Sequence, residues 1–203
     1  MEIEDNEEYV DIDYTEEDFN DLNIKNVKFI NCNFKNADMK NIKTQNCMFS
    51  NCDFTASDLY MSKNTETAFA NCRFEFTILL KSIFTNCKMT GSIFIDCNIK
   101  QMLVNSGDWS YVNMSNSNFM NKNLQNVNFS NAYLCNCNFE KANLFKVNFT
   151  NALLSNSSFK EADLREAVID GIDIKSINIE KTKIDLRQAV QIAEMYGAIC
   201  TDV

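Results

Sequence analysis

The 203-residue chain contains no histidine and no proline, four glycines and a single tryptophan. Histidine is the side chain most often used as a general base and as a metal ligand, so we expect no enzyme activity, no zinc site and no cofactor. Four glycines are too few for a loop that cradles a phosphate group. There is no proline-rich or low-complexity linker, no apolar run of about 18 residues and no basic-then-apolar leader. We therefore expect one cytoplasmic domain without a membrane segment.

What the sequence has instead is a repeat with a period of five residues. Every fifth residue from Phe19 to Ile184 is a candidate core residue, and 32 of these 34 positions are apolar, 14 of them Phe. The two exceptions are Thr44 and Asn64. A period of five matches neither a helical turn nor the alternation of a strand. The repeat itself must be the structural unit, which is typical of a solenoid.

The other positions of each unit are also restricted. The residue two before the central one is small or thin, as in Ala37, Cys72 and Ala142, so both side chains are expected to point inward. The residue two after the centre is Asn in 15 units, including Asn31 and Asn51. Asn tolerates left-handed backbone angles and hydrogen-bonds the local backbone. We therefore expect the chain to turn a corner in every unit.

This pattern resembles the pentapeptide-repeat family, and the resemblance covers about four fifths of the chain. It implies an all-β solenoid, specifically a right-handed quadrilateral β-helix with four units in each coil. The chain length then gives about eight coils, which at roughly 4.8 Å per layer form a rod of about 40 Å.

Two polar residues interrupt the apolar core positions. Thr44 and Asn64 are 20 residues apart, so in a four-sided coil they are neighbours in one inner column. Burying an unpaired hydroxyl or amide costs about 1–3 kcal/mol. We therefore expect 60–67 to project from the rod as a loop.

A second irregular stretch is 101–111. Met102 is bulky where a small residue belongs, and Gly107 is one of the four glycines. Two interpretations are open. Either the core varies locally, with Trp109 filling space beside the glycine, or a second loop projects.

Acidic residues are concentrated at the N-terminus. Residues 1–18 contain ten acids and no base, whereas the remaining residues contain 18 acids and 19 bases. We interpret 1–13 as an acidic N-terminal tail that covers the open edge of the first coil, with Tyr9 and Ile12 in the repeat register. The β-helix then spans 14–185.

Seven of the nine cysteines occupy the small inward position. They are Cys32, Cys47, Cys52, Cys72, Cys87, Cys97 and Cys137. Three of them, Cys32, Cys52 and Cys72, would stack at a distance that a disulfide can span. In an intracellular chain without a CxxC pair, we expect free thiols that act as small hydrophobic residues.

The period changes after Ile184. Asp185 and Gln188 form a capping box ahead of a predicted short α-helix over 186–196, and Gly197 is a natural C-terminal stop. One apolar face of this helix is enough to cover the open end of the last coil. The surplus apolar arc and the strand-like segment 198–200 predict a tail-to-tail homodimer, with 186–203 as its dimerisation module. The candidate interface residues are Val190, Ile192, Ala193, Met195, Tyr196 and Ile199.

This C-terminus is similar to that of the Qnr-type quinolone-resistance proteins within the family. The matching residues are Gln188, Ala189, Ala193, Gly197, Ala198 and Ile199. The resemblance implies a homodimer that binds DNA gyrase and topoisomerase IV, resembles duplex DNA in size, shape and charge, and shields the enzyme from fluoroquinolones. Several such proteins carry two projecting loops that matter for protection, and 60–67 and 101–111 lie roughly where those loops occur.

Candidate topoisomerase-binding residues come from these two stretches and from acids near the proposed dimer centre. They are Tyr60, Met61, Lys63, Glu66, Asp108, Tyr111, Glu161, Asp163, Glu166, Asp170 and Asp173. DNA mimicry requires an array of negative charge, whereas bases outnumber acids in the first four coils of the repeat. A solvated surface of mixed charge is the alternative for most of these residues.

Two other functions stay open. The chain could be a scaffold that binds another protein partner. Direct nucleic-acid binding is a third class, which we do not expect because no aromatic platform accompanies the lysines.

Overall fold

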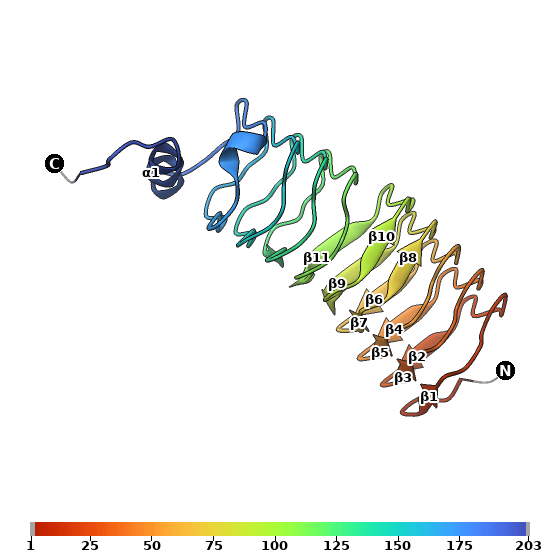
Figure 1. The fold of residues 1–203 in the computed structure, drawn as a ribbon. Helices are drawn as coiled ribbons and strands as arrows, with labels where there is room; N and C mark the ends of the chain where they lie inside the picture. The colour runs from red at the N-terminus through yellow and green to blue at the C-terminus, as the bar shows by residue number, and fades with distance from the viewer. Residues whose placement is uncertain (1–2, 202–203) are drawn as a thin grey trace.

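The computed structural model of the chain describes residues 3–201, which form a rod of stacked coils with a helix beyond its C-terminal end (Figure 1). Each coil takes 20 residues, because parallel pairing repeatedly joins a residue to the one 20 positions later. One such ladder runs in eight steps through Glu8, Lys28, Met48, Ala68, Lys88, Asp108, Asn128, Asn148 and Val168. The predicted β-solenoid of about eight coils is confirmed.

Short strands mark the sides of the coils. They are β1 (Glu8–Val10), β2 (Asn23–Lys25), β3 (Lys28–Ile30), β4 (Lys43–Gln45), β5 (Met48–Ser50), β6 (Lys63–Thr65), β7 (Ala68–Ala70), β8 (Arg73–Glu75), β9 (Ile83–Lys88), β10 (Ile93–Ile95), β11 (Leu103–Asp108) and β12 (Val127–Asn128). The 3-10 turn η1 (Ile174–Ser176) and the helix α1 (Leu186–Met195) follow. Between β12 and η1 the parallel ladder continues as isolated bridges, so the C-terminal half is the same solenoid.

The corners are left-handed, as the Asn pattern predicts. From Asn6 to Gly171, every fifth residue has a positive φ. At several corners the side-chain amide donates to the residue one coil earlier, as from Asn31 to Asp11 at 3.0 Å and from Asn51 to Asn31 at 3.2 Å. These amide ladders offset part of the backbone strain of a positive φ and hold adjacent coils in register.

Like side chains stack on like in the interior. Phe34, Phe54, Phe74 and Phe94 form one column, with successive ring centroids 5.0, 4.9 and 4.6 Å apart and planes within 6° of parallel. The rings of neighbouring columns meet edge to face, as Phe49 does with Phe54 at 5.4 Å. Both geometries are favourable for aromatic pairs. One continuous apolar core therefore runs along the rod.

The two polar residues in the core do not open the coil. Thr44 and Asn64 are 2% and 1% exposed, and the Thr44 hydroxyl donates to the Asn64 side-chain oxygen at 2.9 Å. The Thr67 hydroxyl oxygen lies 2.9 Å from that of Thr44, and the Asn64 amide donates to Ser62 at 3.1 Å. The predicted loop at 60–67 is wrong, because these buried groups satisfy one another and β6 pairs with β4 and β9.

The second irregular stretch also stays within the coil. β11 pairs with β9 on one side and with β12 on the other, so 101–111 does not project as a loop. Trp109 is fully buried and meets Phe84 edge to face. Gly107 has a φ of +126°, and a Cβ there would lie 2.3 Å from the carbonyl oxygen of Cys87. The interpretation as a core variation is confirmed, since only glycine allows this approach.

The acidic N-terminus is part of the solenoid. β1 pairs in register with β3, and the Asp5 carboxylate accepts a hydrogen bond from the backbone N–H of Lys25 at 2.8 Å. Tyr9 stacks on Phe29 at 5.4 Å and extends the core to the end of the rod. This corrects the expected tail at 1–13, because backbone pairing and core packing already operate there. Its first two residues lie outside the described ones.

The C-terminal helix forms as the capping signals predict. Asp185 accepts from the Gln188 N–H and its own N–H donates to the Gln188 side chain, both at 3.0 Å. Segment 198–200 pairs with no strand within residues 3–201. Since a strand needs a partner edge, that pairing stays a prediction about a dimer, and 202–203 lie outside the described residues. No helix in the described part of the chain is long and apolar enough to cross a membrane.

Candidate interaction surfaces

The rod presents four flat sides and the corners between them. Among residues 3–201, no three or more cysteine, aspartate or glutamate side chains gather closely enough to hold a metal ion. The predicted interaction residues lie on the sides and corners of the rod, and we take the predicted groups in turn.

The first predicted group spans one side and its two corners. Tyr60 and Met61 lie at one corner, Lys63 is exposed on β6, and Glu66 is at the next corner. The Lys81 ammonium of the following coil lies 5.8 Å from the centroid of the Tyr60 ring, which favours a fixed ring position. The structure thus brings these four residues together on a flat surface and not on a loop.

In the second predicted group, Asp108 is hydrogen-bonded within the rod and Tyr111 is exposed. Asp108 accepts hydrogen bonds from the Asn128 side chain at 2.8 Å and from the Ser110 N–H at 3.1 Å. Its carboxylate is therefore engaged in holding two coils together. Tyr111 stands at a corner and is 57% exposed, so it is the residue of this group that can contact a partner.

The predicted acids between 161 and 173 encircle one coil and do not share a side. Glu161 and Glu166 stand at two successive corners. Each lies near a lysine of the coil before, Glu161 at 3.9 Å from Lys141 and Glu166 at 3.4 Å from Lys146. Exposed pairs of this kind contribute little to stability, so both carboxylates can exchange their lysine for another cation.

The other three acids already interact with neighbouring groups of the same chain. Asp163 pairs with Arg165 at 2.6 Å, and the hydrogen bond from this guanidinium lowers the pKa of the carboxyl. Asp170 accepts a hydrogen bond from Gln191 of α1, and Asp173 caps η1. Of the five acids, Glu161 and Glu166 are therefore the best placed to meet a partner.

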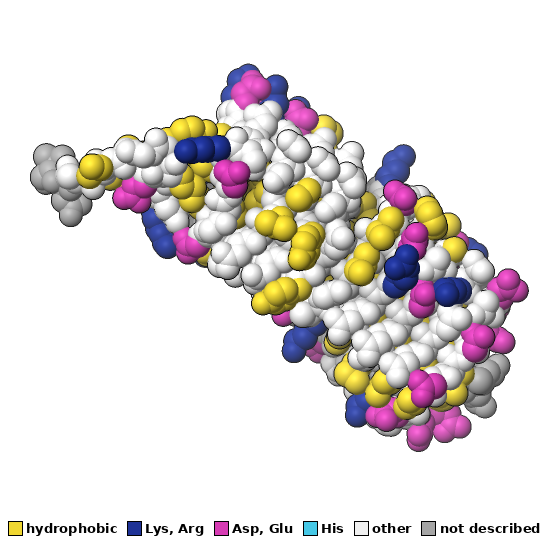
Figure 2. All heavy atoms as spheres, viewed as in Figure 1, with side chains coloured by type: hydrophobic (Ala, Val, Ile, Leu, Met, Phe, Trp, Pro, Cys, Tyr) yellow, Lys and Arg dark blue, Asp and Glu magenta, His cyan; other side chains and the backbone are white. Residues whose placement is uncertain are grey.

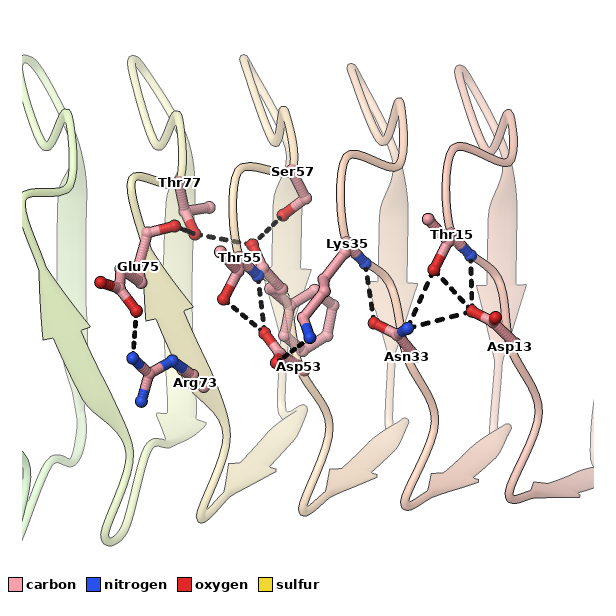
Figure 3. Close-up of polar contacts among 11 residues, drawn as sticks. Asp13, Thr15, Asn33, Lys35, Asp53, Thr55, Ser57, Arg73, Glu75 and Thr77 are labelled. Atoms are coloured by element: carbon pink, nitrogen blue, oxygen red, sulfur yellow. Dashed lines mark hydrogen bonds and ion pairs between the residues drawn. The ribbon is translucent and has the colours of Figure 1, made fainter.

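One side of the first four coils carries charges that pair with one another (Figure 3). The Lys35 ammonium lies 3.3 Å from the carboxylate of Asp53 in the next coil. Arg73, one coil further, pairs with Glu75. For these coils the contacts favour the interpretation as a solvated surface of mixed charge.

The strongest acidic surface lies at the N-terminal end. Figure 2 shows acidic side chains gathered around that end of the rod. A lysine of the second coil approaches them, as where Lys28 lies 3.5 Å from Glu8. The charge concentration read from the sequence is thus displayed on a folded coil.

The thiols are mostly buried and protonated. All nine cysteines are free, and six of them are buried. Burial raises the pKa of Cys87 to about 11 and the pKa of Cys97 and of Cys137 to about 12. Because the thiolate is the reactive form, these groups are unreactive at neutral pH. Their burial agrees with the predicted role as small core residues.

α1 packs one face against the rod. The Gln188 side chain is 2% exposed and donates to the carbonyl oxygens of Leu164 and Ala167 at 2.6 and 2.8 Å. Ile192 and Met195 pack against the core of the last coils. The sequence indicated Gln188 only as a capping residue, and it placed Ile192 and Met195 in a dimer interface. In the single chain, all three anchor α1 to the rod.

The rest of α1 and the segment that follows it carry exposed apolar side chains. Among the predicted interface residues, Val190, Tyr196 and Ile199 are 45, 62 and 91% exposed, and Ala193 is partly buried. Leu186, which the dimer prediction did not include, is 87% exposed. We call Leu186, Val190, Tyr196 and Ile199 the outer apolar face.

A further apolar group stands on the rod itself. Tyr133 and Leu153 pair in successive coils and are 49 and 50% exposed. Phe76 is 56% exposed at a corner. Figure 2 shows apolar side chains along the middle of the visible surface. For Tyr133 and Leu153 the sequence signal is an aromatic or aliphatic residue just before the central one, where the repeat usually has Asn or Asp.

Two family models match the chain. The model described as pentapeptide repeat region matches residues 112–188, and the model described as pentapeptide repeats (8 copies) matches 18–59 and 68–101. The chain belongs to the pentapeptide-repeat family. The matched ranges leave out 60–67 and 102–111. The coils of this pentapeptide-repeat protein nevertheless continue through both stretches.

Solved structures of QnrB1, a plasmid-mediated fluoroquinolone resistance protein, have the same fold. A trypsin-treated variant of QnrB1 superposes with a TM-score of 0.83 at 20% identity, covering 96% of this chain and 97% of that chain. Full-length QnrB1 gives a TM-score of 0.76 at 20% identity, covering 94% and 100%. A comparison with curated proteins finds no match. The pentapeptide-repeat fold is thus shared over nearly the whole length of both chains.

Proposed function

We propose that this protein binds a type II topoisomerase, DNA gyrase or topoisomerase IV, and protects it from quinolones as a non-catalytic cytoplasmic partner. The observation that carries the proposal is the likeness in fold to QnrB1, a fluoroquinolone resistance protein, over 96% of this chain and 97% of that one. A rod whose outer surface makes the contact needs neither a pocket nor a cofactor.

The proposed contact imitates duplex DNA. A surface that binds DNA carries positive potential, so a protein substitute must offer carboxylates in place of phosphates. Glu161 and Glu166 supply these at two corners, with Asp163, Asp170 and Asp173 adding negative charge on the same coil. The proposed surface also includes Tyr111 with Asp108, and the flat group Tyr60, Met61, Lys63 and Glu66.

We further propose that two copies join through the outer apolar face of α1. Four large apolar side chains exposed on one short segment favour burial against a second copy. The hydrogen bond from Gln191 to Asp170 keeps α1 beside the acidic coil. A two-fold axis through α1 would therefore place the acids of both copies near the centre of one longer rod.

Light scattering tests the dimer with a matched control. The variant Val190→Glu with Tyr196→Glu places charges on the outer apolar face, so it should be monomeric with unchanged circular dichroism. The control Leu153→Glu places a charge on an equally exposed apolar residue of the rod, and it should stay dimeric. A wild-type monomer, or a dimer that persists in the double variant, would reject this interface.

Supercoiling by ciprofloxacin-inhibited DNA gyrase tests the protection. Purified protein at low micromolar concentration should restore supercoiling, and Glu161→Gln with Glu166→Gln should weaken the rescue. The matched control is Glu16→Gln with Asp21→Asn, at two corners of the first coil, which should rescue like wild type. No rescue by the wild-type protein at any ratio would reject the proposal, and equal loss in the control would reject the assigned surface.

The second candidate function is a scaffold for another protein. The exposed pair Tyr133 and Leu153 favours the scaffold function. Apolar side chains on a flat side of the rod suit contact with another protein and do not imitate the phosphates of DNA. This alternative predicts that wild-type protein neither binds gyrase in surface plasmon resonance nor rescues it. It also predicts that Leu153→Ser abolishes capture of the true partner, whereas the Glu161 and Glu166 variants leave that capture unchanged.

A further inference from the structure

The backbone ladder between successive coils is broken near the middle of the rod. Within residues 3–201, no backbone hydrogen bond joins 96–106 to 115–125, the facing segments of the coil that carries β11 and of the next coil (Figure 1). Regular bonding flanks the break. The Phe94 N–H donates to the Asn113 carbonyl on one side and the Trp109 N–H to the Asn128 carbonyl on the other, both at 2.8 Å.

The equivalent backbone hydrogen bonds are present at the neighbouring coil interfaces. One coil earlier, the Lys81 N–H donates to the carbonyl of Lys100 at 3.1 Å. One coil later, the Asn121 N–H donates to the carbonyl of Glu140 at 2.9 Å. The equivalent donor between them, the Gln101 N–H, has no partner within the described residues. The break is therefore local to one coil interface.

Lys122 lies within the break and takes the place of part of the backbone ladder. It occupies the small inward position that Ser82 fills two coils earlier and Ala142 fills in the next coil, both buried. A lysine ammonium cannot stay in an apolar core. It lies between the coils, where Nζ donates to the carbonyl oxygens of Ile99 at 3.1 Å and Met102 at 2.9 Å. Partial burial of this ammonium lowers the pKa of Lys122.

The break opens a cleft between the two coils. It has a volume of ≈ 540 Å³ and is lined by 96–101 and 115–118, together with Met120 and Lys122. A second hollow of ≈ 240 Å³, lined in part by 104–106, Asn123, Gln125 and Asn126, continues along the same break. In the cleft, Cys97 and Ser117 are partly exposed, whereas the residues in the same column of other coils, such as Thr77 and Ser157, are buried.

The two edges of the cleft offer unpaired backbone N–H groups. The N–H groups of Asp96 and Gln101 on one edge, and of Asn118 and Asn123 on the other, have no protein partner within residues 3–201. Rows of such groups are what an incoming strand pairs with. Elsewhere along the rod, the next coil fills this role.

The charge of the lining selects among extended peptides. Lys100 and Lys122 face the cleft together with one acid, Asp96. Lys122 uses two of its three N–H donors on backbone carbonyls, so one donor remains for a ligand. An acidic side chain in the bound peptide would meet this donor in a partly buried position, where charge-assisted hydrogen bonds are strong.

We propose that the cleft between these two coils binds an extended peptide segment with an acidic side chain, which pairs with the free backbone edges as an added strand and places its carboxylate at Lys122. The partner is a protein that exposes such a segment. The site uses none of the residues assigned to topoisomerase binding, so the two proposals stand or fall separately.

Fluorescence anisotropy with defined peptides tests the site. The probe is a fluorescein-labelled Thr-Val-Thr-Glu-Thr-Val peptide, which should bind saturably to the full-length protein. The same peptide with Lys for Glu should bind at least about tenfold more weakly. So should a version N-methylated at alternate residues, because it lacks the backbone donors that pair with a strand edge.

Lys122→Ala is the matching protein variant. Alanine fills this position in the next coil, so the ladder should close and peptide affinity should fall at least about tenfold. Hydrogen exchange at the Gln101 and Asn123 amides should slow in the variant, and in wild type on adding peptide. The control Lys43→Ala removes an exposed lysine of β4 and should change neither measurement.

Several outcomes would overturn the proposal. One is no anisotropy change at about 1 mM peptide, and another is equal binding of the N-methylated peptide. Displacement by inorganic phosphate alone would show a simple anion site. Gln101 and Asn123 amides already protected in the free wild-type protein would show that the cleft is closed in solution, and this measurement stands even if Lys122→Ala does not fold.

Discussion

Replacing Thr44 with valine tests the polar pair inside the core. Valine keeps the shape of threonine but has no hydroxyl, so the Asn64 side-chain oxygen loses its donor at 2.9 Å while it stays buried. The Thr67 hydroxyl loses the same neighbour. A buried acceptor left without a partner costs about 1–3 kcal/mol of unfolding free energy. In a chain of this size, each kcal/mol lowers Tm by about 2–4 °C.

Adding Asn64→Leu in the same chain separates this cause from a packing effect. Leucine is the residue of this column in three later coils, at Leu124, Leu144 and Leu164. Both single variants lose the same hydrogen bond between Thr44 and Asn64, so the double variant should be more stable than the sum of the single losses predicts, by about 0.5–3 kcal/mol. Calorimetry and circular dichroism on the four proteins measure this coupling. Additive losses, or an unchanged Tm for Thr44→Val, would refute the reasoning.

Three other perturbations follow from packing and charge. Gly107→Ala should lower Tm strongly, since the added Cβ meets the Cys87 carbonyl oxygen at 2.3 Å; a variant as stable as wild type in calorimetry would mean that the coils can part there. Phe54→Ala should cost about 3–5 kcal/mol in denaturant unfolding, because it empties a site between rings stacked at 5.0 and 4.9 Å, and a loss under about 1 kcal/mol would contradict that packing. Hydrogen bonds, chiefly from the Gln188 N–H, lower the pKa of Asp185 below its ordinary 3.8. The folded state therefore binds fewer protons at Asp185 than the unfolded state does. The stabilisation of α1 by the Asp185 carboxylate is complete above pH 3.8 and is lost as pH falls through the lowered pKa. The protection of the α1 amides, measured relative to their intrinsic exchange rates at each pH, should therefore fall in acid for wild type but not for Asp185→Asn, and identical pH profiles would show that Asp185 does not hold the helix.

The sequence was sufficient for the features that repeat. The spacing of five predicted the stacked columns of Phe34, Phe54 and Phe74, because a fixed period places equivalent residues above one another whatever the details of each coil. The Asn pattern predicted the left-handed corners. The capping box at Asp185 and Gln188 predicted α1, because these signals act within a few residues of sequence.

The loops and the site depended on contacts between coils, which no local pattern contains. The projecting loop at 60–67 assumed that Asn64 would be buried without a partner, and the structure supplies Thr44 from the coil before. The Lys122 cleft could have been predicted from the sequence, since a lysine at the small inward position departs from the repeat. The face of α1 that meets the rod could not be chosen from amphipathicity alone, because apolar residues cover most of the helix and the buried anchor is the polar Gln188.

The left-handed corners make the edges of the rod unusually open to sequence change. Between Asn6 and Gly171 they hold Asn and Asp, but also Glu, Lys, Met, Phe and Tyr, and no Val, Ile or Thr. Branching at Cβ is what a positive φ excludes, whereas an unbranched side chain extends into solvent without touching the core. At a corner without an amide ladder, exchange of one unbranched residue for another can therefore change the side chain that a partner meets without disturbing the core. Natural selection can alter the binding specificity of such a rod one corner at a time.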